Sequence, residues 1–517
     1  MPLMSSGPSL TAPRRGDRWQ TVFAVLIFLE FSSLLLALLI PQRAADLHSA
    51  YGQLLIAALA GALFAHAGLP RQRELRVYLA FLLWLLISRW LNRDFYLFLD
   101  RPLLLDNLLA FLLLASCLQL DKVRRQRLLL AVTIVYAGFF VLFSAIGLFI
   151  ALTGTYLHIP PENVWITLLP SNFLGIKTRV INLLSTHRLT MASFLYLAWS
   201  LLVYQILRLR KKGWILPLAL GLLILHLTLT LCYSRTVQIC FSLSCAMLAL
   251  LFLYRRKMRG VKRVLVLVLI PLLCVPVVYK SFDVFGNLLG VLRAEIAPRF
   301  EESYRGRSPL DPNLFGLETA QGEASAQEEP AAEAVPAPEA VTSAFKTAAS
   351  LASSGDSTQQ DIFQEHRTLS GNVTLTGRTA IWRSAIPSVR AKPSILFYGQ
   401  PEKQIMPLAN QFIHSDYKTH MHNSLVQCFM LTGLPGLLLA AAWYVLLLIK
   451  LIRTFFSGSD TPFATAFLTI PLSGIMLYSM LETIMFSSVG LAGFTFFLIA
   501  GFFLAEESEC ARISPEA

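Results

Sequence analysis

The chain has 517 residues, of which 55% are hydrophobic and 15% are charged, and its formal net charge is +13. A water-soluble protein of this length needs a more polar surface, so the composition excludes an ordinary soluble protein. An excess of Lys and Arg suits nucleic-acid binding in a soluble chain, but here these residues lie in short clusters between apolar blocks. Such clusters are typical of loops that face anionic membrane lipids, and no nucleic-acid partner is expected.

Apolar blocks of about 20 residues recur along the chain, and each is long enough to cross a hydrocarbon core as a helix. Helices satisfy their own backbone hydrogen bonds in lipid, and the residue alternation of a membrane β-barrel is absent from the sequence. We therefore expect an all-α polytopic membrane protein with about twelve transmembrane helices. The predicted spans are residues 20–40, 52–69, 76–92, 102–119, 128–153, 189–207, 213–232, 236–254, 263–280, 424–449, 462–482 and 486–505.

Clusters of Lys and Arg alternate with the predicted spans and indicate the topology. The clusters fall before the first span and then after every second span, as far as the tenth. Under the positive-inside rule, this parity predicts that both termini are cytoplasmic. The first apolar block is too long for the core of a signal peptide, so we expect it to be retained as a membrane helix.

A large loop between the ninth and tenth spans lies on the predicted external face. It divides the chain into N-terminal helices (1–280), an external loop (281–422) and C-terminal helices with a tail (423–517). Within the loop, residues 317–361 are rich in Ala, Glu, Pro, Ser and Thr, which predicts a disordered insertion. Residues 363–422 regain apolar and aromatic side chains, so we expect this part to fold against the membrane helices.

A smaller external segment, residues 155–187, precedes the sixth span. It mixes Pro and Trp with apolar residues, and this mixture predicts a short helix lying at the membrane interface. Arg188 follows directly and begins the sixth span on the same face.

His422 lies where the large loop re-enters the membrane, directly before the tenth span. A neutral imidazole can take a proton near pH 7, and a helix N-terminus favours a bound anion. His422 therefore suits a general base beside a phosphate, although a histidine that caps the helix fits the same position. Upstream, residues 376–386 predict a short amphipathic helix that ends at Pro387, with Arg378 in its first turn. Arginine binds phosphate bidentately, and a local ion pair is the alternative role for Arg378.

Arg235 occupies a very short turn between the seventh and eighth spans, so its charge lies at membrane level. Each external arginine taken singly fits an interfacial anchor. Arginine is less common at external span ends, yet Arg188, Arg235 and Arg378 map to the same face as His422. One basic site for a dianionic headgroup explains this grouping more economically than separate anchors.

The sequence offers no pattern for a metal or another cofactor. The seven cysteines lack metal-ligand spacing, and the external loops contain no D-x-D acidic pair. The glycine pattern of a nucleotide-binding loop is also missing from the sequence, which argues against an ATP-driven pump. We therefore expect arginines, in place of a metal, to neutralise a departing diphosphate.

At these residues the sequence resembles the O-antigen ligase and polymerase superfamily. His422-Asn423, nine further residues and then Gly433-Leu434-Pro435-Gly436 resemble that family's H-N-x9-G-x-x-G signature. The family's other landmarks have counterparts in matching order and spacing over residues 130–450. These counterparts are Ser234-Arg235, Gly377-Arg378 with Trp382, and Phe397-Tyr398-Gly399. The sequence departs from the pattern after Arg188, where the family's glycine and Pro-Asn positions are missing.

The resemblance implies a metal-independent inverting glycosyltransferase of the GT-C type in the bacterial inner membrane, with its active site facing the periplasm. The donor would be a glycan on undecaprenyl diphosphate, and the acceptor would be lipid A-core or another glycan. His422 would be the general base, while Arg378 and Arg235 would stabilise the departing diphosphate. Further substrate contacts would come from Arg188, Asn423, His420 and Arg383.

Several functions remain open at the level of sequence. Ligation to lipid A-core is the first reading, and polymerisation of glycan chains or transfer to a protein hydroxyl uses the same motifs. A transporter of lipid-linked glycans is the alternative from a different class. Transporters commonly contain inverted repeats and paired broken helices. The sequence shows no such repeat between its halves, which favours the transferase.

Overall fold

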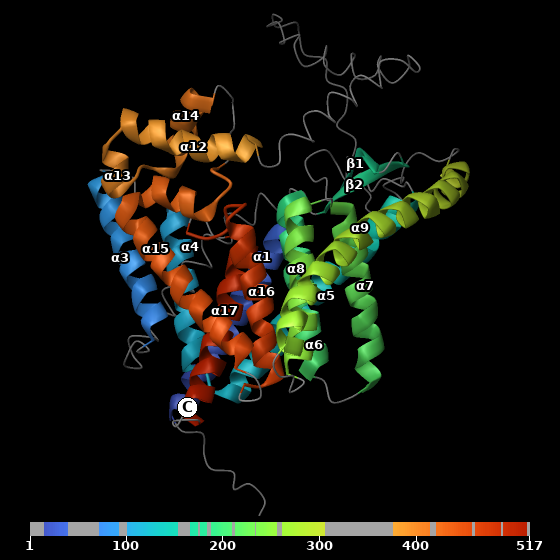
Figure 1. Ribbon diagram of the computed structural model, residues 1–517, viewed down its shortest axis with the longest axis horizontal. Helices are drawn as coiled ribbons and strands as arrows, with labels where there is room; N and C mark the ends of the chain where they lie inside the picture. Colours follow the sequence, from blue (N-terminus) through green and yellow to red (C-terminus); the bar gives the residue numbers. More distant parts are fainter. Residues whose placement is uncertain are drawn as a thin grey trace, which may run out of the picture.

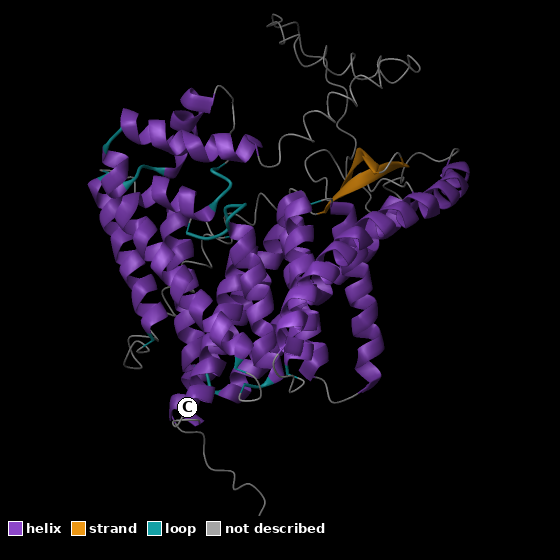
Figure 2. Cartoon of the chain, viewed as in Figure 1, coloured by secondary structure: helices purple, strands orange, loops and turns teal. Residues whose placement is uncertain are grey.

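The computed structural model is almost entirely helical (Figure 2). The predicted span 52–69 and the 317–361 insertion lie outside the described residues. The structure describes residues 15–39, 72–92, 101–153, 166–173, 176–183, 188–208, 212–232, 234–255, 261–304, 376–413, 420–457, 461–486 and 490–513.

Long helices that run side by side make up the body of the protein (Figure 1). The N-terminal group is α1 (Arg15–Leu39), α3 (Arg73–Leu91), α4 (Arg101–Gln119), α5 (Lys122–Thr153), α6 (Arg188–Arg208), the 3-10 helix η1 (Lys212–Trp214), α7 (Ile215–Cys232), α8 (Arg235–Tyr254) and α9 (Val261–Tyr304). The C-terminal group is α15 (Ser424–Phe456), α16 (Phe463–Ser479) and α17 (Leu491–Ile513). α9 continues without a break across residue 280, where the sequence predicted the end of the ninth span.

Seven of the described helices are long and apolar enough to cross a membrane. Three shorter apolar helices, within α1, α4 and α16, stand beside them. The chain is therefore a helical multi-pass membrane protein, as its composition predicts. The count of about twelve spans and the placement of the loops stay predictions.

A two-stranded hairpin corrects the expectation of a purely helical chain. Strands β1 (Ile166–Phe173) and β2 (Ile176–Leu183) pair antiparallel, with Ile166 opposite Leu183 and Phe173 opposite Ile176. The prediction of a short interfacial helix within residues 155–187 is wrong for this part. Its β-branched residues favour extended backbone, and pairing between the strands satisfies the backbone groups that a helix would otherwise satisfy internally.

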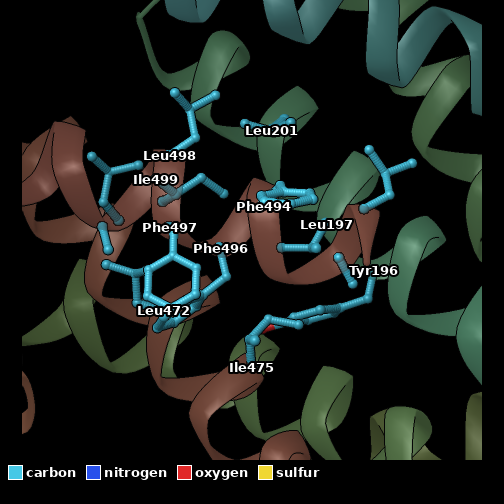
Figure 3. Packing of buried hydrophobic residues seen from close by; sticks show 14 of the residues in the cluster. Tyr196, Leu197, Leu201, Leu472, Ile475, Phe494, Phe496, Phe497, Leu498 and Ile499 are labelled. Atoms are coloured by element: carbon cyan, nitrogen blue, oxygen red, sulfur yellow. The ribbon is translucent and has the colours of Figure 1, made fainter. Parts of the chain in front are cut away.

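The core lies where α6, α16 and α17 meet in the middle of the bundle (Figure 3). Leu197 of α6, Ile475 of α16 and Phe497 of α17 are each at most 1% exposed. Aromatic side chains extend this core, with the ring of Trp443 in α15 lying 5.6 Å from that of Phe497. α15 and α16 also pack side by side, so the segment before α15 and the segment after α16 lie close together.

Three helices form a cap over one end of the bundle, above α3 and α15 (Figure 1). They are α12 (Thr376–Ala391), α13 (Ser394–Tyr398) and α14 (Glu402–Ile413). Ile381 of α12 and Ile405 of α14 are buried in one apolar cluster with Leu85 of α3 and Leu431 of α15. Residues 376–413 therefore fold against the membrane helices, as predicted for this part of the loop.

α12 is longer than the sequence predicts, because it continues through Pro387 instead of ending there. Proline removes one backbone donor from a helix but does not always end it. On one side of Pro387, Ser384 is buried, and on the other side the buried Ser388 donates its hydroxyl to the Ser384 carbonyl at 2.7 Å. This bond and the packing on both sides hold the helix together across the proline.

Ion pairs occupy the end of the bundle opposite the cap. Arg125, at the start of α5, lies 2.6 Å from Glu509 and 3.6 Å from Glu506, both near the end of α17. Lys450 of α15 lies 2.9 Å from Glu507 in the same way. Arg125 and Lys450 belong to basic clusters that the sequence assigns to the cytoplasmic face, so this end remains the predicted cytoplasmic one.

Candidate active site

α15 begins beneath the cap, and Asn423 is its N-cap. The Asn423 side-chain oxygen accepts hydrogen bonds from the amides of Leu425 and Val426 at 2.9 and 3.0 Å. Its side-chain nitrogen donates to the carbonyl of Met480, just after α16, at 2.8 Å. Asparagine is a preferred N-cap because it satisfies amides that the helix leaves unpaired. One residue therefore starts α15 and ties it to the segment that follows α16.

His422 directly precedes this cap and has a left-handed backbone, with φ 49°. Non-glycine residues seldom adopt this conformation, and it turns the His422 side chain away from the direction that the helix would give it. Neighbouring bonds hold the backbone in place. Trp382 of α12 donates its ring N–H to the Met421 carbonyl at 2.9 Å, and the Met421 amide donates to Gln427 at 3.1 Å. The His422 amide donates to Nδ1 of His420 at 3.2 Å.

The segment after α16 brings an acidic residue to His422. The hydroxyl of Ser424 donates to the Glu482 carbonyl at 3.2 Å and accepts from the amides of Ile484 and Met485 at 3.1 and 3.2 Å. Ser424 itself is fully buried. These bonds fix the backbone of the segment beside the first turn of α15, so the Glu482 carboxylate has a defined position.

Glu482 joins His422 to Arg378. Its Oε2 lies 3.0 Å from Nδ1 of His422, and its Oε1 accepts a hydrogen bond from Nη2 of Arg378. The Glu482 side chain is only 7% exposed, so the carboxylate has little water to solvate it. Burial raises the pKa of Glu482, but the His422 hydrogen bond and the Arg378 charge outweigh burial and hold that pKa below its ordinary value of 4.5. Glu482 is therefore a carboxylate anion that contacts Arg378 and His422 at the same time.

The other edge of the site is the start of α8. Nη1 of Arg378 lies 3.5 Å from the hydroxyl of Thr236, in the first turn of α8. Arg235 is the first residue of that helix, and its side chain is exposed. The N-cap residue Ser234 makes no side-chain cap bond. Its hydroxyl is buried and has no hydrogen-bond partner within the part of the chain that the structure describes. A helix start whose cap hydroxyl lacks a partner among the described residues, and whose first turn contacts the guanidinium of Arg378, favours an anion.

A break in α15 explains the first glycine of the H-N-x9-G-x-x-G pattern. Gly433 has φ 73° and ψ −172°, so the helix is interrupted there. Gly399, which ends α13, also has a left-handed φ of 69°. The two glycines cross so closely that a β-carbon on Gly433 would overlap the carbonyl of Phe397, and one on Gly399 would overlap that of Leu431. Only glycine allows this approach, which packs the cap against the first half of α15.

Side chains of α3 satisfy the carbonyl groups that the break exposes. The ring N–H of Trp84 donates to the Thr432 carbonyl at 2.7 Å. Arg89, which is buried, donates to the Leu431 carbonyl at 3.0 Å. Buried carbonyls need such partners, so α3 stabilises the interrupted conformation. The part of α15 before Gly433, which follows His422 directly, is thus held by α3, by the cap and by the segment after α16.

The structure brings some of the sequence-predicted residues together and leaves others apart. Arg378 and His422 meet at Glu482, and Thr236 places the start of α8, with Arg235, beside Arg378. The ring of His420 lies 4.3 Å from that of His422, so His420 belongs to the same site.

Three further candidates stand differently. Asn423 uses both polar atoms of its side chain for bonds inside the protein, and its expected substrate contact stays a prediction. Arg383 is exposed, and five residues along α12 turn it well away from the face of Arg378. Arg188 is the first residue of α6, and its side chain is not among those that the structure describes.

Glu482 is the residue that the sequence analysis missed. Glu482 is the last residue of the predicted span 462–482, so the sequence predicts that it belongs to the membrane helix. In the structure, α16 ends at Ser479 and Glu482 lies in the segment beyond it. The available signal was an acidic residue at an external span end, since a charge at such a position commonly has a partner.

A metal ion is a possible occupant by composition alone. Ligand atoms of His420, His422 and Glu482 lie within 4.8 Å of one another, and three protein ligands suffice for a catalytic zinc. Both carboxylate oxygens of Glu482 already have partners, however, and the guanidinium of Arg378 beside them repels a cation. We therefore do not assign these residues to a metal.

Together, the fold and this site define a helical multi-pass membrane protein with a general-base candidate and cationic groups at one end of its bundle. Residues 220–441 match the family model described as O-antigen ligase. The chain therefore carries a domain of the O-antigen ligase family, and the resemblance inferred from its motifs is confirmed over this segment. The matched segment includes Arg235, Arg378 and His422. A comparison with curated proteins found no match to the chain.

Proposed function

We propose that the protein is a glycosyltransferase that moves a glycan from undecaprenyl diphosphate to an acceptor hydroxyl, with ligation to lipid A-core as its reaction. The observation that carries this proposal is the junction at Glu482, which links His422 to Arg378 beside the start of α8. The family match supports a lipid-linked glycan as the substrate class. The junction adds an acid–base group next to a site for the diphosphate.

His422 is the general base in this proposal. The Glu482 carboxylate accepts the proton on Nδ1, so that Nε2 carries the free lone pair. Nε2 takes the proton of the acceptor hydroxyl as the acceptor oxygen forms a bond to the anomeric carbon. The bond between that carbon and the phosphate oxygen breaks on the opposite face, and its electron pair leaves with the diphosphate. A single displacement of this kind inverts the anomeric configuration.

Arg378 and Arg235 bind the leaving diphosphate, together with the start of α8. Negative charge grows on the bridging phosphate oxygen as the bond breaks, and fixed cationic groups lower the energy of that transition state. A planar guanidinium can hold two phosphate oxygens at once. The hydroxyl of Ser234, which has no hydrogen-bond partner among the described residues, supplies a further donor at the same place. Guanidinium groups thereby take the role that a metal has in other transferases, and the reaction needs no metal.

The membrane location follows from the same arrangement. The cap, the start of α15 and the end of α16 lie at one end of the bundle, opposite the end of α17 whose glutamates pair with Arg125 and Lys450 (Figure 1). We assign the end with the ion pairs to the cytoplasm, because the basic clusters lie there. The site then faces the periplasm of a bacterial inner membrane, both termini are cytoplasmic, and the bundle is a GT-C-type scaffold.

The decisive experiment replaces His422 by alanine and measures transfer of a lipid-linked glycan to lipid A-core in membranes that lack the native protein. We expect transfer to fall by at least about a hundredfold, the usual contribution of a general base. Lys403→Ala is the matched control, since Lys403 is an exposed cation on α14 of the same cap. Normal transfer by a well-expressed His422→Ala protein would refute the general-base role.

Product analysis separates ligation from polymerisation, the alternative within the same family. A ligase yields lipid A-core bearing the glycan, whereas a polymerase lengthens the glycan on undecaprenyl diphosphate. Both products depend on His422 in the same way. A protein that moves the intact lipid-linked glycan across the membrane, with neither product, would instead be the transporter.

A further inference from the structure

We infer that Glu482 couples donor binding to the activation of His422: the diphosphate draws Arg378 away from Glu482 and leaves the full carboxylate charge to the imidazole. This inference rests on the proposed function and assigns a positioning role to a residue outside the matched family segment, residues 220–441. In this exchange the guanidinium group of Arg378 leaves Glu482 and binds the diphosphate.

The contacts of Glu482 are the starting point of this exchange. Each oxygen of Glu482 has one partner, Arg378 on Oε1 and His422 on Oε2. The Glu482 and Arg378 side chains are 7% and 14% exposed, so solvent screens their interaction weakly. A carboxylate that is neutralised by a guanidinium attracts the proton on His422 Nδ1 less strongly than an unpaired carboxylate does. In this arrangement Glu482 orients His422 while it shares its charge with Arg378.

The next step of the exchange follows from the position of Arg378. One of its nitrogens binds Glu482, and the other lies 3.5 Å from Thr236 in the first turn of α8. The arginine thus already reaches towards Arg235 and the uncapped start of α8, where the diphosphate is proposed to bind. A diphosphate carries more negative charge than one carboxylate and offers paired oxygens to the guanidinium fork. Arg378 therefore changes partner when the donor arrives.

The other charged and titratable groups around the junction do not reverse this effect. His420 lies on the same segment as His422, and Tyr478 comes from the last turn of α16. Arg235 approaches from α8, but its charge is directed to the same diphosphate. With Arg378 withdrawn, Glu482 is the anion in direct contact with His422, and it stabilises the imidazolium that forms when the acceptor proton is taken.

The exchange predicts that diphosphate binding takes up protons. The experiment titrates the full-length protein in lipid nanodiscs with undecaprenyl diphosphate by calorimetry near pH 7, in buffers of different ionisation enthalpy. We expect the wild-type protein to take up a measurable fraction of one proton per bound molecule. Glu482→Gln keeps the size of the side chain but removes its charge, and we expect most of the uptake to vanish.

The affinity of the same variant distinguishes coupling from a merely structural role. Glu482→Gln releases Arg378, so we expect it to bind undecaprenyl diphosphate more tightly, by about threefold or more, while glycan transfer falls by at least about tenfold. A variant that simply damaged the site would lose both. Glu507→Gln, which alters an acid at the opposite end of the bundle, is the control and is expected to match wild type in binding and transfer.

Two results would overturn the coupling. One is a Glu482→Gln protein with wild-type proton uptake, because the protons would then come from direct contact between the diphosphate and His422. The other is weaker binding of undecaprenyl diphosphate by a folded Glu482→Gln protein. Failure of the proposed function is a separate result, since wild-type protein would then form no glycosylated product whatever the outcome of the titration.

Discussion

The indole N–H of Trp382 donates to the carbonyl oxygen of Met421 at 2.9 Å, so the helix that carries Arg378 also holds the residue before His422. Trp382 is one helical turn from Arg378 on α12. The candidate residues Arg378 and His422 are therefore both positioned by α12. Their separation does not depend on the membrane helices alone.

The Trp382 bond gives a first test. We expect Trp382→Phe to lower the transfer rate by about tenfold, because a free Met421 carbonyl lets His422 leave its left-handed conformation. The loss of one hydrogen bond should cost about 1 kcal/mol of stability, too little to unfold the protein. Transfer rate and thermal unfolding are measured together. A normal rate in Trp382→Phe would show that α12 does not position the base.

The crossing of Gly399 and Gly433 gives a second test. We expect Gly433→Ala to destabilise the protein by about 2 kcal/mol or more, because the added β-carbon overlaps the Phe397 carbonyl and φ is left-handed. Gly138→Ala is the matched control, since nothing lies within 4 Å of a β-carbon added to Gly138 of α5. The control should be neutral or slightly stabilising. Equal melting temperatures for the two variants would contradict the crossing.

The cap of α15 gives a third test. We expect Asn423→Ala to lose about 1 kcal/mol of stability and to lower kcat more than it raises KM, because the cap and the tie to Met480 are both removed. Asn423→Ser can restore the helix cap but not the tie, so it should recover stability better than activity. Were Asn423 a substrate contact instead, KM would carry most of the change in both variants.

The lowered pKa of Glu482 gives a fourth test, on the pH dependence of stability. The folded state holds this carboxyl below its ordinary value of 4.5, so the unfolded state binds its proton first as the pH falls. The stabilisation by Glu482 is therefore fully present above about pH 5 and is lost as the pH falls through the folded pKa. The difference in melting temperature between wild type and Glu482→Gln should shrink over that range. A difference that grows on acidification would have the wrong sign.

Metal removal gives a fifth test. We expect transfer to continue at its normal rate after exhaustive treatment with a chelator, because guanidinium groups provide the positive charge beside Glu482. Transfer is measured before and after chelation and after addition of zinc or magnesium. Loss of activity that the metal restores would reassign His420, His422 and Glu482 as ligands.

Much of the site was predictable because its chemistry is local in sequence. His422 precedes a long apolar run, and Arg235 stands in a turn too short to leave the membrane surface. These features place both residues at one end of the bundle before any contact is known. The helical fold was predictable for the same reason, since the length of an apolar block is a local property.

The parts that could not be predicted depend on contacts between distant segments. Glu482 is 60 residues beyond His422, and only the packing of α15 against α16 brings the two together. The extent of α12 beyond Pro387 depends on burial under the cap. The hairpin of β1 and β2 depends on pairing between two strands, and the sequence of one strand alone does not reveal its partner.

The interruption of α15 at Gly433 separates the first part of the helix, next to His422, from the longer part that follows. The half-helix before the break is bonded to α12 through Met421, to α13 and α14 through Met430 and Gln400, and to the segment after α16 through Ser424. His422 and Glu482 are therefore held in place by bonds from several elements at once. We therefore expect the proposed donor, with its bulky glycan and long polyprenyl tail, to be accommodated on the facing side, where α7 turns into α8.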